Sequence, residues 1–229
     1  MKLKELAAKK ALEYVRSGMI LGLGTGSTSA IFVDALGAAL RNGALKDIRG
    51  VPTSEAVANR ARKMAIPLTT LADHPRLDLA IDGADEVDGK FNLIKGLGRA
   101  LLREKIVETH AERFIVIVDE SKVVERLGSK VPLPVEIVQF EALAHVRWLG
   151  TLGCKAELWL EEDGSPVITD NGNFLVRCWF DKSPESGIPD PYHLAQELIQ
   201  RPGVVEHGLF LDMADLVIVA GEDGLSILE

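Results

Sequence analysis

A glycine-rich segment, Gly22-Leu23-Gly24-Thr25-Gly26-Ser27-Thr28, lies between a short apolar run and a helical pattern. Glycines let a backbone turn tightly and approach a ligand closely. The N-terminus of the following helix offers unpaired N–H groups and the positive end of the helix dipole to an anion. Thr25, Ser27 and Thr28 add hydroxyl donors, so the segment predicts a phosphate-binding loop that includes Gly26. The alternative is a plain glycine turn in which Ser27 caps the helix.

Two more specific nucleotide-binding patterns are missing from this segment. A dinucleotide fingerprint needs a third glycine at position 27, which is serine, and the Gly-Lys-Ser/Thr of a P-loop is absent. We therefore expect a simple phosphate site and no nicotinamide.

An acidic segment, Asp82-Gly83-Ala84-Asp85-Glu86, follows the apolar run 77–81. Ligands of open α/β sheets bind at the carboxyl ends of strands, where Asp82 and Asp85 would converge on one small polar ligand. The alternatives are a solvated loop and a divalent-metal site. The spacing lacks the pattern of a calcium loop and no histidine is nearby, so we expect no metal.

A second glycine-rich turn, Lys95-Gly96-Leu97-Gly98-Arg99, opens a helix predicted over 99–110. Glu104 shares a face of that helix with Ala100, Leu101 and Val107, and only Glu108 is polar among its near neighbours. Desolvation by apolar neighbours makes a carboxylate a stronger base, which suits proton abstraction. The alternative is a salt bridge to a basic residue such as Lys105 or Arg103.

One further cation follows the apolar run 114–118. Lys122 would reach the ligand site at the carboxyl ends of the strands and bind a phosphate there. The alternative is a lone surface lysine.

The elements that must position these residues alternate between strand and helix. Strands are predicted at 19–24, 48–51, 77–81 and 114–118, and helices at 27–42, 54–64 and 99–110. This alternation predicts an α/β fold with a Rossmann-like, mainly parallel sheet.

The pattern changes near Lys130. Residues 131–135 are a proline-containing stretch, which disfavours a helix there. Helices are predicted at 141–150 and 191–200. Strands are predicted at 156–160, 167–169 and 173–180. We expect parallel-type strands at 204–211 and 215–220 that rejoin the first sheet. The predicted domains are therefore 1–129 plus 206–229, a Rossmann-like catalytic domain, and 130–205, an inserted smaller α+β domain.

Composition excludes several classes of protein. The chain has 229 residues and a formal net charge of −8, so non-specific nucleic-acid binding is not expected. The two cysteines are too few for a disulfide framework. The segment 1–5 is charged and lacks the apolar region of a secretory signal, and no apolar run approaches about 20 residues. We expect a soluble cytoplasmic protein with no membrane partner.

Taken together, the motifs resemble ribose-5-phosphate isomerase of type A. The segments that carry the resemblance are GLGTGST at 22–28, DGADE at 82–86, KGLG at 95–98, LLREK at 101–105, Ser121-Lys122, PLPVE at 132–136 and TDNGN at 169–173, with PGVV at 202–205 and GLF at 208–210. The resemblance covers nearly the whole chain. It implies metal-independent interconversion of ribose 5-phosphate and ribulose 5-phosphate through an enediolate, without a cofactor.

The resemblance also implies roles for residues. Glu104 would be the base, Asp82 would handle hydroxyl and ring-opening protons, Lys95 would stabilise the enediolate oxygen, and Asp85 would orient sugar hydroxyls. The substrate-binding residues would be Thr25, Gly26, Ser27, Thr28, Asp82, Gly83, Ala84, Asp85, Lys95, Gly96, Leu97, Gly98 and Lys122. The family usually forms homodimers or homotetramers.

This sequence departs from the family pattern at Leu97, a usual glycine, and at Arg99, a usually small residue. We expect the turn to survive, with Arg99 either adding a cation near an anionic substrate or pairing with an acid outside the site.

Two other functions stay open on the residues alone. One is a sugar-phosphate-binding sensor without catalysis, which has no need for a buried helix glutamate or for Lys95. The other is a CoA-transferase-like enzyme that uses a glutamate as covalent nucleophile.

Overall fold

The computed structural model describes residues 2–181 and 187–229, which form two compact units. Unit 1 contains residues 1–84, 103–122 and 213–229, and unit 2 contains residues 85–102 and 123–212. Among the described residues, no helix combines the length and the apolar character needed to cross a membrane.

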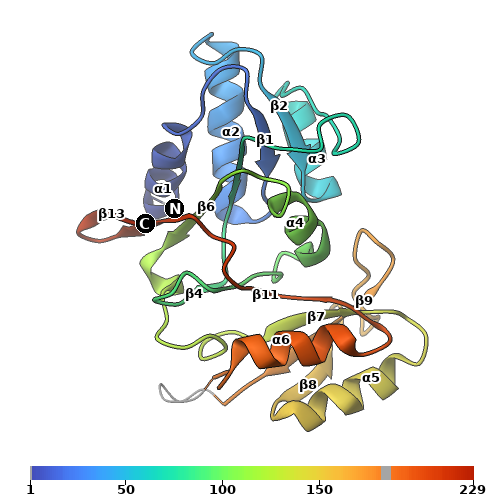
Figure 1. Ribbon diagram of the computed structural model, residues 1–229. Helices are drawn as coiled ribbons and strands as arrows, with labels where there is room; N and C mark the ends of the chain where they lie inside the picture. Colours follow the sequence, from blue (N-terminus) through green and yellow to red (C-terminus); the bar gives the residue numbers. More distant parts are fainter. Residues whose placement is uncertain (1, 182–186) are drawn as a thin grey trace. The chain divides into compact units, whose positions relative to one another are not determined.

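Unit 1 is built on a six-stranded sheet in the order β13-β12-β6-β3-β1-β2 (Figure 1). Its strands are β1 (Ile20–Leu23), β2 (Arg49–Pro52), β3 (Leu79–Asp82), β6 (Phe114–Asp119), β12 (Leu216–Gly221) and β13 (Gly224–Leu228). All neighbouring strands are parallel except β12 and β13, which form an antiparallel hairpin at one edge. The expected mainly parallel α/β fold is confirmed.

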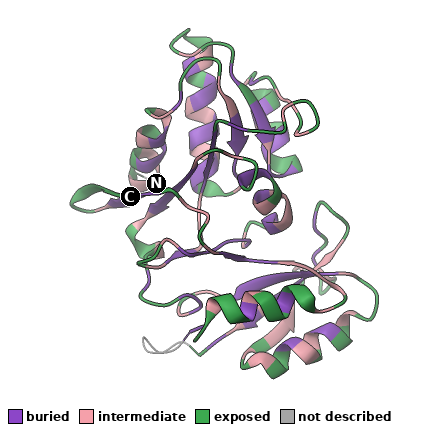
Figure 2. Cartoon of the chain, in the orientation of Figure 1, coloured by how far each residue is buried: buried purple, intermediate pink, exposed green. Residues whose placement is uncertain are grey.

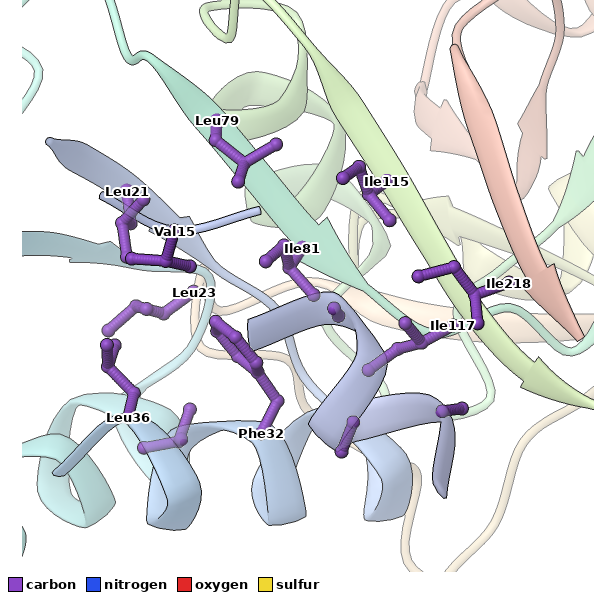
Figure 3. Close-up of a cluster of buried hydrophobic side chains, with 14 of the residues drawn as sticks. Val15, Leu21, Leu23, Phe32, Leu36, Leu79, Ile81, Ile115, Ile117 and Ile218 are labelled. Carbon is purple, nitrogen blue, oxygen red and sulfur yellow. The ribbon is translucent and has the colours of Figure 1, made fainter. Parts of the chain in front are cut away.

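The helices of unit 1 cover both faces of this sheet. They are α1 (Lys2–Leu12), α2 (Ser27–Arg41), α3 (Glu55–Lys63) and α4 (Leu101–Glu108), whose first two residues belong to unit 2, and the short η1 (Glu120–Lys122) follows β6. Phe32 and Leu36 of α2 point at the sheet side chains in the main core, which Figure 3 shows. A smaller cluster of Val51, Leu77 and Val107 places α4 against the sheet.

Successive side chains of a strand point to opposite faces of the sheet, and both faces are covered here, which explains why these strands are apolar throughout. Ile115 and Ile117 belong to the main core, whereas Val116, also fully buried, points to the opposite face. A strand covered on both faces has no solvated side, which is why β6 and β12 are buried over most of their length (Figure 2).

Unit 2 is an α+β structure with its own core. A four-stranded sheet has the order β10-β7-β9-β8 and a three-stranded sheet has the order β11-β5-β4, and every pairing is antiparallel. The strands are β4 (Glu86–Val87), β5 (Leu93–Ile94), β7 (Leu133–Ile137), β8 (Lys155–Leu158), β9 (Phe174–Trp179), β10 (Val204–His207) and β11 (Leu209–Phe210). The helices are α5 (Ala142–Leu149), η2 (Gly150–Leu152) and α6 (Pro191–Gln200).

One sequence prediction about topology is wrong. Residues 204–211 were expected to be parallel-type strands of the first sheet, but β10 pairs with β7 and β11 pairs with β5, both antiparallel. The apolar run has the composition of a buried strand, and composition does not select a partner strand. The strand after it, β12, does join β6 in the first sheet.

The structure also groups the segment Asp85–Leu102 with unit 2, although the sequence boundaries placed it in the first domain. The reason is strand pairing, since β4 and β5 belong to the same sheet as β11 and Val87 bridges Val123. Of the predicted strand at 167–169, only a single bridge from Ile168 to Phe174 is formed.

Candidate active site

The site residues of unit 1 gather where β1 and β3 end. Asp82, the last residue of β3, is fully buried, and its Oδ1 accepts hydrogen bonds from Ser29 Oγ (2.7 Å) and Gly83 N (2.7 Å). A Cβ at Gly24 would overlap the Asp82 carboxyl group. Gly24 is therefore required because the carboxylate packs directly against the backbone after β1.

The glycine-rich loop turns into α2 at Gly26, whose φ of 128° is open only to glycine without strain. Thr25 Oγ1 hydrogen-bonds to Thr53 Oγ1 (2.7 Å) and Ser54 Oγ (2.9 Å), which fixes the loop to the end of β2. No side-chain cap is formed at the start of α2, so the alternative of Ser27 as an N-cap is wrong. Ser27 is the first residue of the helix.

Lys4 brings a cation to this loop that the sequence did not reveal. Its Nζ donates to Ser27 Oγ (2.8 Å), from α1 to the first residue of α2. No motif marks Lys4, because a lysine on an amphipathic helix is ordinarily a solvated residue. An ammonium at the start of α2 adds to the positive end of the helix dipole.

Glu104 lies in α4 and is 2% exposed. Val107, one turn later on the same face, packs with Val51 and Leu77 under the sheet. A Cβ at Gly22 would lie 2.9 Å from Val107 Cγ1, so α4 sits against β1 at its closest possible approach. The face that carries Glu104 is thereby fixed to the strand that leads into the glycine-rich loop.

The basic neighbour Arg103 forms an ion pair with α3. Its Nη1 donates to Glu55 Oε1 at the start of α3 (2.9 Å).

Two other features of unit 1 bear on the site. Lys122 ends η1, directly after β6, and is half-buried. Within residues 2–181 and 187–229, no group of three or more His, Cys, Asp or Glu side chains is arranged to hold a metal ion.

Unit 2 carries the second glycine-rich turn. Lys95 follows β5 and is 2% exposed, with Nζ 5.4 Å from the centre of the Phe210 ring. Its backbone N donates to Gly208 O (2.9 Å). A buried ammonium next to an aromatic face is a fixed positive charge in an environment of low dielectric constant.

Asp85 holds this turn in place. Its Oδ2 accepts a hydrogen bond from Leu97 N (2.9 Å), and its backbone N donates to Ile94 O (2.7 Å). Gly96 has a φ of 109°, and a Cβ there would lie 2.9 Å from Leu101. Because the position that demands glycine is 96, leucine at 97 is compatible with the turn.

Arg99 pairs with an acid in unit 2. Its guanidinium forms two hydrogen bonds to the Glu161 carboxylate, at 2.5 and 3.0 Å, and lies 5.4 Å from the ring of Trp159. Its φ of 66° is in the left-handed region. Of the two expectations for Arg99, the structure supports the ion pair.

Glu86 shows why the acidic segment has three carboxylates. It is fully buried and accepts hydrogen bonds from the backbone N–H groups of Gly128, Lys130 and Val131, at 2.5, 2.6 and 2.8 Å. Three such donors satisfy a buried carboxylate. Glu86 therefore anchors the segment before β7 and is a structural residue.

The structure thus joins the predicted residues in two groups. In unit 1, Asp82 contacts the glycine-rich loop, and α4 carries Glu104 against β1. In unit 2, Asp85 binds the turn that follows Lys95. Ser29 and Lys4 are the two polar contacts that sequence reasoning missed. Buried carboxylates beside a glycine-rich loop, on a doubly covered parallel sheet, are typical of an α/β enzyme with a small-molecule site at the carboxyl ends of its strands.

Comparisons with known proteins identify the family. A model of ribose 5-phosphate isomerase A (phosphoriboisomerase A) matches residues 49–224. Ribose-5-phosphate isomerase A of Roseiflexus castenholzii is 52% identical over 223 residues, covering 97% of this chain and 93% of that protein. A probable chloroplastic ribose-5-phosphate isomerase of Arabidopsis thaliana is 49% identical over 231 residues, covering 99% of this chain and 82% of that protein.

Solved structures agree. A D-ribose-5-phosphate isomerase in complex with phospho-erythronic acid has a TM-score of 0.95 and 44% identity, covering 100% of this chain and 98% of that chain. Ribose 5-phosphate isomerase A of Methanocaldococcus jannaschii has a TM-score of 0.92 and 41% identity, with the same coverage. The chain belongs to the ribose 5-phosphate isomerase A family, whose members are aldose–ketose isomerases that interconvert ribose 5-phosphate and ribulose 5-phosphate.

Proposed function

We propose that this chain interconverts D-ribose 5-phosphate and D-ribulose 5-phosphate through an enediolate, with Glu104 as the base. The observation that carries the proposal is the burial of the Glu104 carboxylate on a helix clamped to β1 at Gly22. A base that shuttles one proton between two adjacent carbons needs a fixed position and little water around it.

The proton transfer uses one carboxylate twice. Glu104 removes the proton from C2 of the open-chain aldose, and the electron pair forms the C1–C2 double bond while the C1 carbonyl oxygen becomes the enediolate oxygen. That oxygen is protonated, the C2 hydroxyl loses its proton, and Glu104 returns the first proton to C1. The sum is an isomerisation with no net gain or loss of atoms or electrons.

Asp82 supplies the hydroxyl chemistry in this proposal. The hydrogen bonds from Ser29 and Gly83 fix the orientation of its carboxylate at the end of β3. A carboxylate held this way relays the protons of ring opening and of the sugar hydroxyls.

Lys95 and Asp85 are proposed to act on the reacting oxygens. The buried ammonium of Lys95 stabilises the negative enediolate oxygen, which is the largest charge that develops in the reaction. Asp85 holds the turn at Leu97 N and orients sugar hydroxyls.

The phosphate group is assigned to the start of α2. Backbone N–H groups and hydroxyls of Thr25, Ser27 and Thr28, with Lys4 Nζ at Ser27, form an anion-binding group in unit 1, and Lys122 is a further phosphate partner. Gly26, Gly83, Ala84, Gly96, Leu97 and Gly98 are proposed to contact the substrate through their backbones. Binding of this non-reacting group positions the reacting carbons.

Relatives support the substrate class. The similar structure with 44% identity holds phospho-erythronic acid, a phosphorylated sugar acid, and the named relatives are ribose-5-phosphate isomerases. We propose that this chain acts without metal in the non-oxidative pentose phosphate pathway, in the cytoplasm, as a homodimer or homotetramer. Two free cysteines, Cys154 and Cys178, are consistent with a reducing compartment.

The test is turnover of ribose 5-phosphate by the wild-type chain with EDTA present, together with thermal unfolding in ribose 5-phosphate or acetyl-CoA. Ribulose 5-phosphate formation and a raised Tm in ribose 5-phosphate alone support the proposal. Protection by acetyl-CoA alone would favour the CoA-transferase function. Protection by ribose 5-phosphate without turnover would favour a sensor.

A further inference from the structure

Unit 1 contains a cavity that the proposed chemistry does not use. It has a volume of about 750 Å³ and lies between β2, α3, the segment Leu68–His74 and Arg103 of α4. None of the residues proposed to contact the sugar phosphate lines it. A cavity of 300–1,000 Å³ is the size that binds a small organic molecule.

Two arginines give this cavity a positive charge. Arg49 and Arg62 line it, and neither guanidinium forms an ion pair with a carboxylate of the described residues. Among the described residues, the only side-chain hydrogen bond of Arg62 runs from its Nη1 to the neutral Asn59 Oδ1 (2.9 Å). Two like charges at one concave surface favour an anion between them.

The acidic groups of the cavity are already engaged. Glu55 accepts from Arg103 Nη1 (2.9 Å), and Asp73 Oδ2 accepts from Thr70 Oγ1 (2.7 Å) within its own turn. Because Glu55 pairs with Arg103, the wall keeps the guanidinium groups of Arg49 and Arg62 against the single carboxylate of Asp73, which leaves a net positive charge. In a chain with a net charge of −8, such a local excess of positive charge is a specific feature.

The rest of the wall is apolar. Val51, Ala58 and Leu71 line the cavity beside the arginines, and His74 adds an imidazole. An inorganic ion would use only the charged part of this surface. A ligand with both an anionic group and a compact apolar group would use all of it.

We propose that this cavity binds a small organic phosphate at a site separate from the isomerase centre. Guanidinium groups of Arg49 and Arg62 hold the phosphate oxygens, because the planar donor pair of arginine matches phosphate geometry. The apolar part of the ligand lies on Val51, Ala58 and Leu71. The inference stands on the cavity alone and does not depend on the proposed isomerase activity.

The test must separate this site from the glycine-rich loop, because Ser54 lines the cavity and also hydrogen-bonds to Thr25. His74 provides a local probe, since it lines the cavity and the chain has only five histidines. Its imidazole C2–H resonance, assigned by its loss in His74→Gln, is followed by NMR at constant pH and ionic strength while phenyl phosphate is added. Phenol and inorganic phosphate are titrated in parallel.

We expect a saturable shift of the His74 resonance with phenyl phosphate, weaker binding of inorganic phosphate and no shift with phenol. The double variant Arg49→Gln/Arg62→Gln should bind phenyl phosphate about ten-fold or more weakly, because it loses two charge-assisted contacts. The matched control Arg41→Gln/Arg76→Gln removes the same charge from arginines outside the cavity and should bind as the wild type does. Lys4→Gln, which removes the cation from the glycine-rich loop, should also leave the titration unchanged.

Three results would overturn the proposal. One is a His74 resonance that does not move at about 10 mM phenyl phosphate, because any binding would then have a Kd well above that concentration. Another is equal weakening by the two double arginine variants, which would indicate unspecific charge attraction. The third is loss of binding in Lys4→Gln, which would place the phosphate at the glycine-rich loop.

Discussion

The carboxylate of Asp82 shows how single residues set this site. It is buried at the end of β3, and it is tolerated there because Ser29 and Gly83 donate to it and Gly24 leaves room for it. The sequence predicted Asp82 and the glycines from their spacing. It did not predict Ser29, because a serine two residues into a helix carries no signal of its own.

Lys4 is the residue whose role is most easily tested. We expect Lys4→Gln to raise KM for ribose 5-phosphate about five- to fifty-fold with kcat changed much less, because the lysine hydrogen-bonds to Ser27 in the proposed phosphate-binding loop. Steady-state kinetics check this. Lys2→Gln, a lysine on the same helix, is the control and should behave as the wild type. Equal KM values for Lys4→Gln and wild type would remove Lys4 from the phosphate site.

At the scale of elements, the packing of α4 on β1 determines where Glu104 stands. We expect Gly22→Ala to destabilise the protein by about 1–3 kcal/mol, because its Cβ would meet Val107 Cγ1 and Ala80 Cβ, and to lower kcat by displacing α4. Urea unfolding and kinetics measure the two effects.

The double variant Gly22→Ala/Val107→Ala is the matched test of that contact. It should recover part of the lost kcat, with a coupling free energy above about 0.5 kcal/mol, because the second substitution removes the overlapping methyl group. Gly89→Ala adds a Cβ where nothing lies within 4 Å and should change little. Strictly additive effects of the two substitutions would show that α4 is not held by this contact.

The turn between β5 and α4 carries the two departures from the family pattern. We expect Arg99→Gln to lower the free energy of unfolding by less than about 1 kcal/mol, because the ion pair with Glu161 is partly exposed and screened by solvent. Catalytic kcat/KM should stay within about two-fold of the wild type, since the guanidinium is directed to Glu161. A large rise in KM for ribose 5-phosphate, measured by steady-state kinetics, would instead assign Arg99 to the substrate.

The strands of the first sheet were easier to predict from the sequence than β7 of unit 2. The strands of the first sheet were predictable because burial on both faces leaves continuous apolar runs such as 114–118 and 216–220. β7 was not, because Pro134 argues against an inner strand. The structure accommodates Pro134 beside the break between β10 and β11, where its carbonyl accepts from Gly208 N (2.8 Å).

On the scale of the whole molecule, chain order alone misplaced the segment 204–211. The residues of β10 and β11 have the apolar composition of a buried strand, as β12 has, yet of these three only β12 joins the first sheet. Local pattern reports burial and period, whereas strand partners depend on contacts far apart in the sequence. The candidate chemistry was predictable because its residues lie in short motifs, and the cavity of Arg49 and Arg62 was not because its wall comes from four separate segments.

The central claim is that Glu104 moves the proton. The direct measurement is turnover of ribose 5-phosphate in D₂O with EDTA, for wild type and for the isosteric variant Glu104→Gln, with the deuterium content of C1 of ribulose 5-phosphate followed by NMR. We expect the wild type to form product with deuterium at C1, and Glu104→Gln to lose about 10²- to 10⁴-fold in kcat while still binding substrate. Turnover by Glu104→Gln at the wild-type rate would contradict the account.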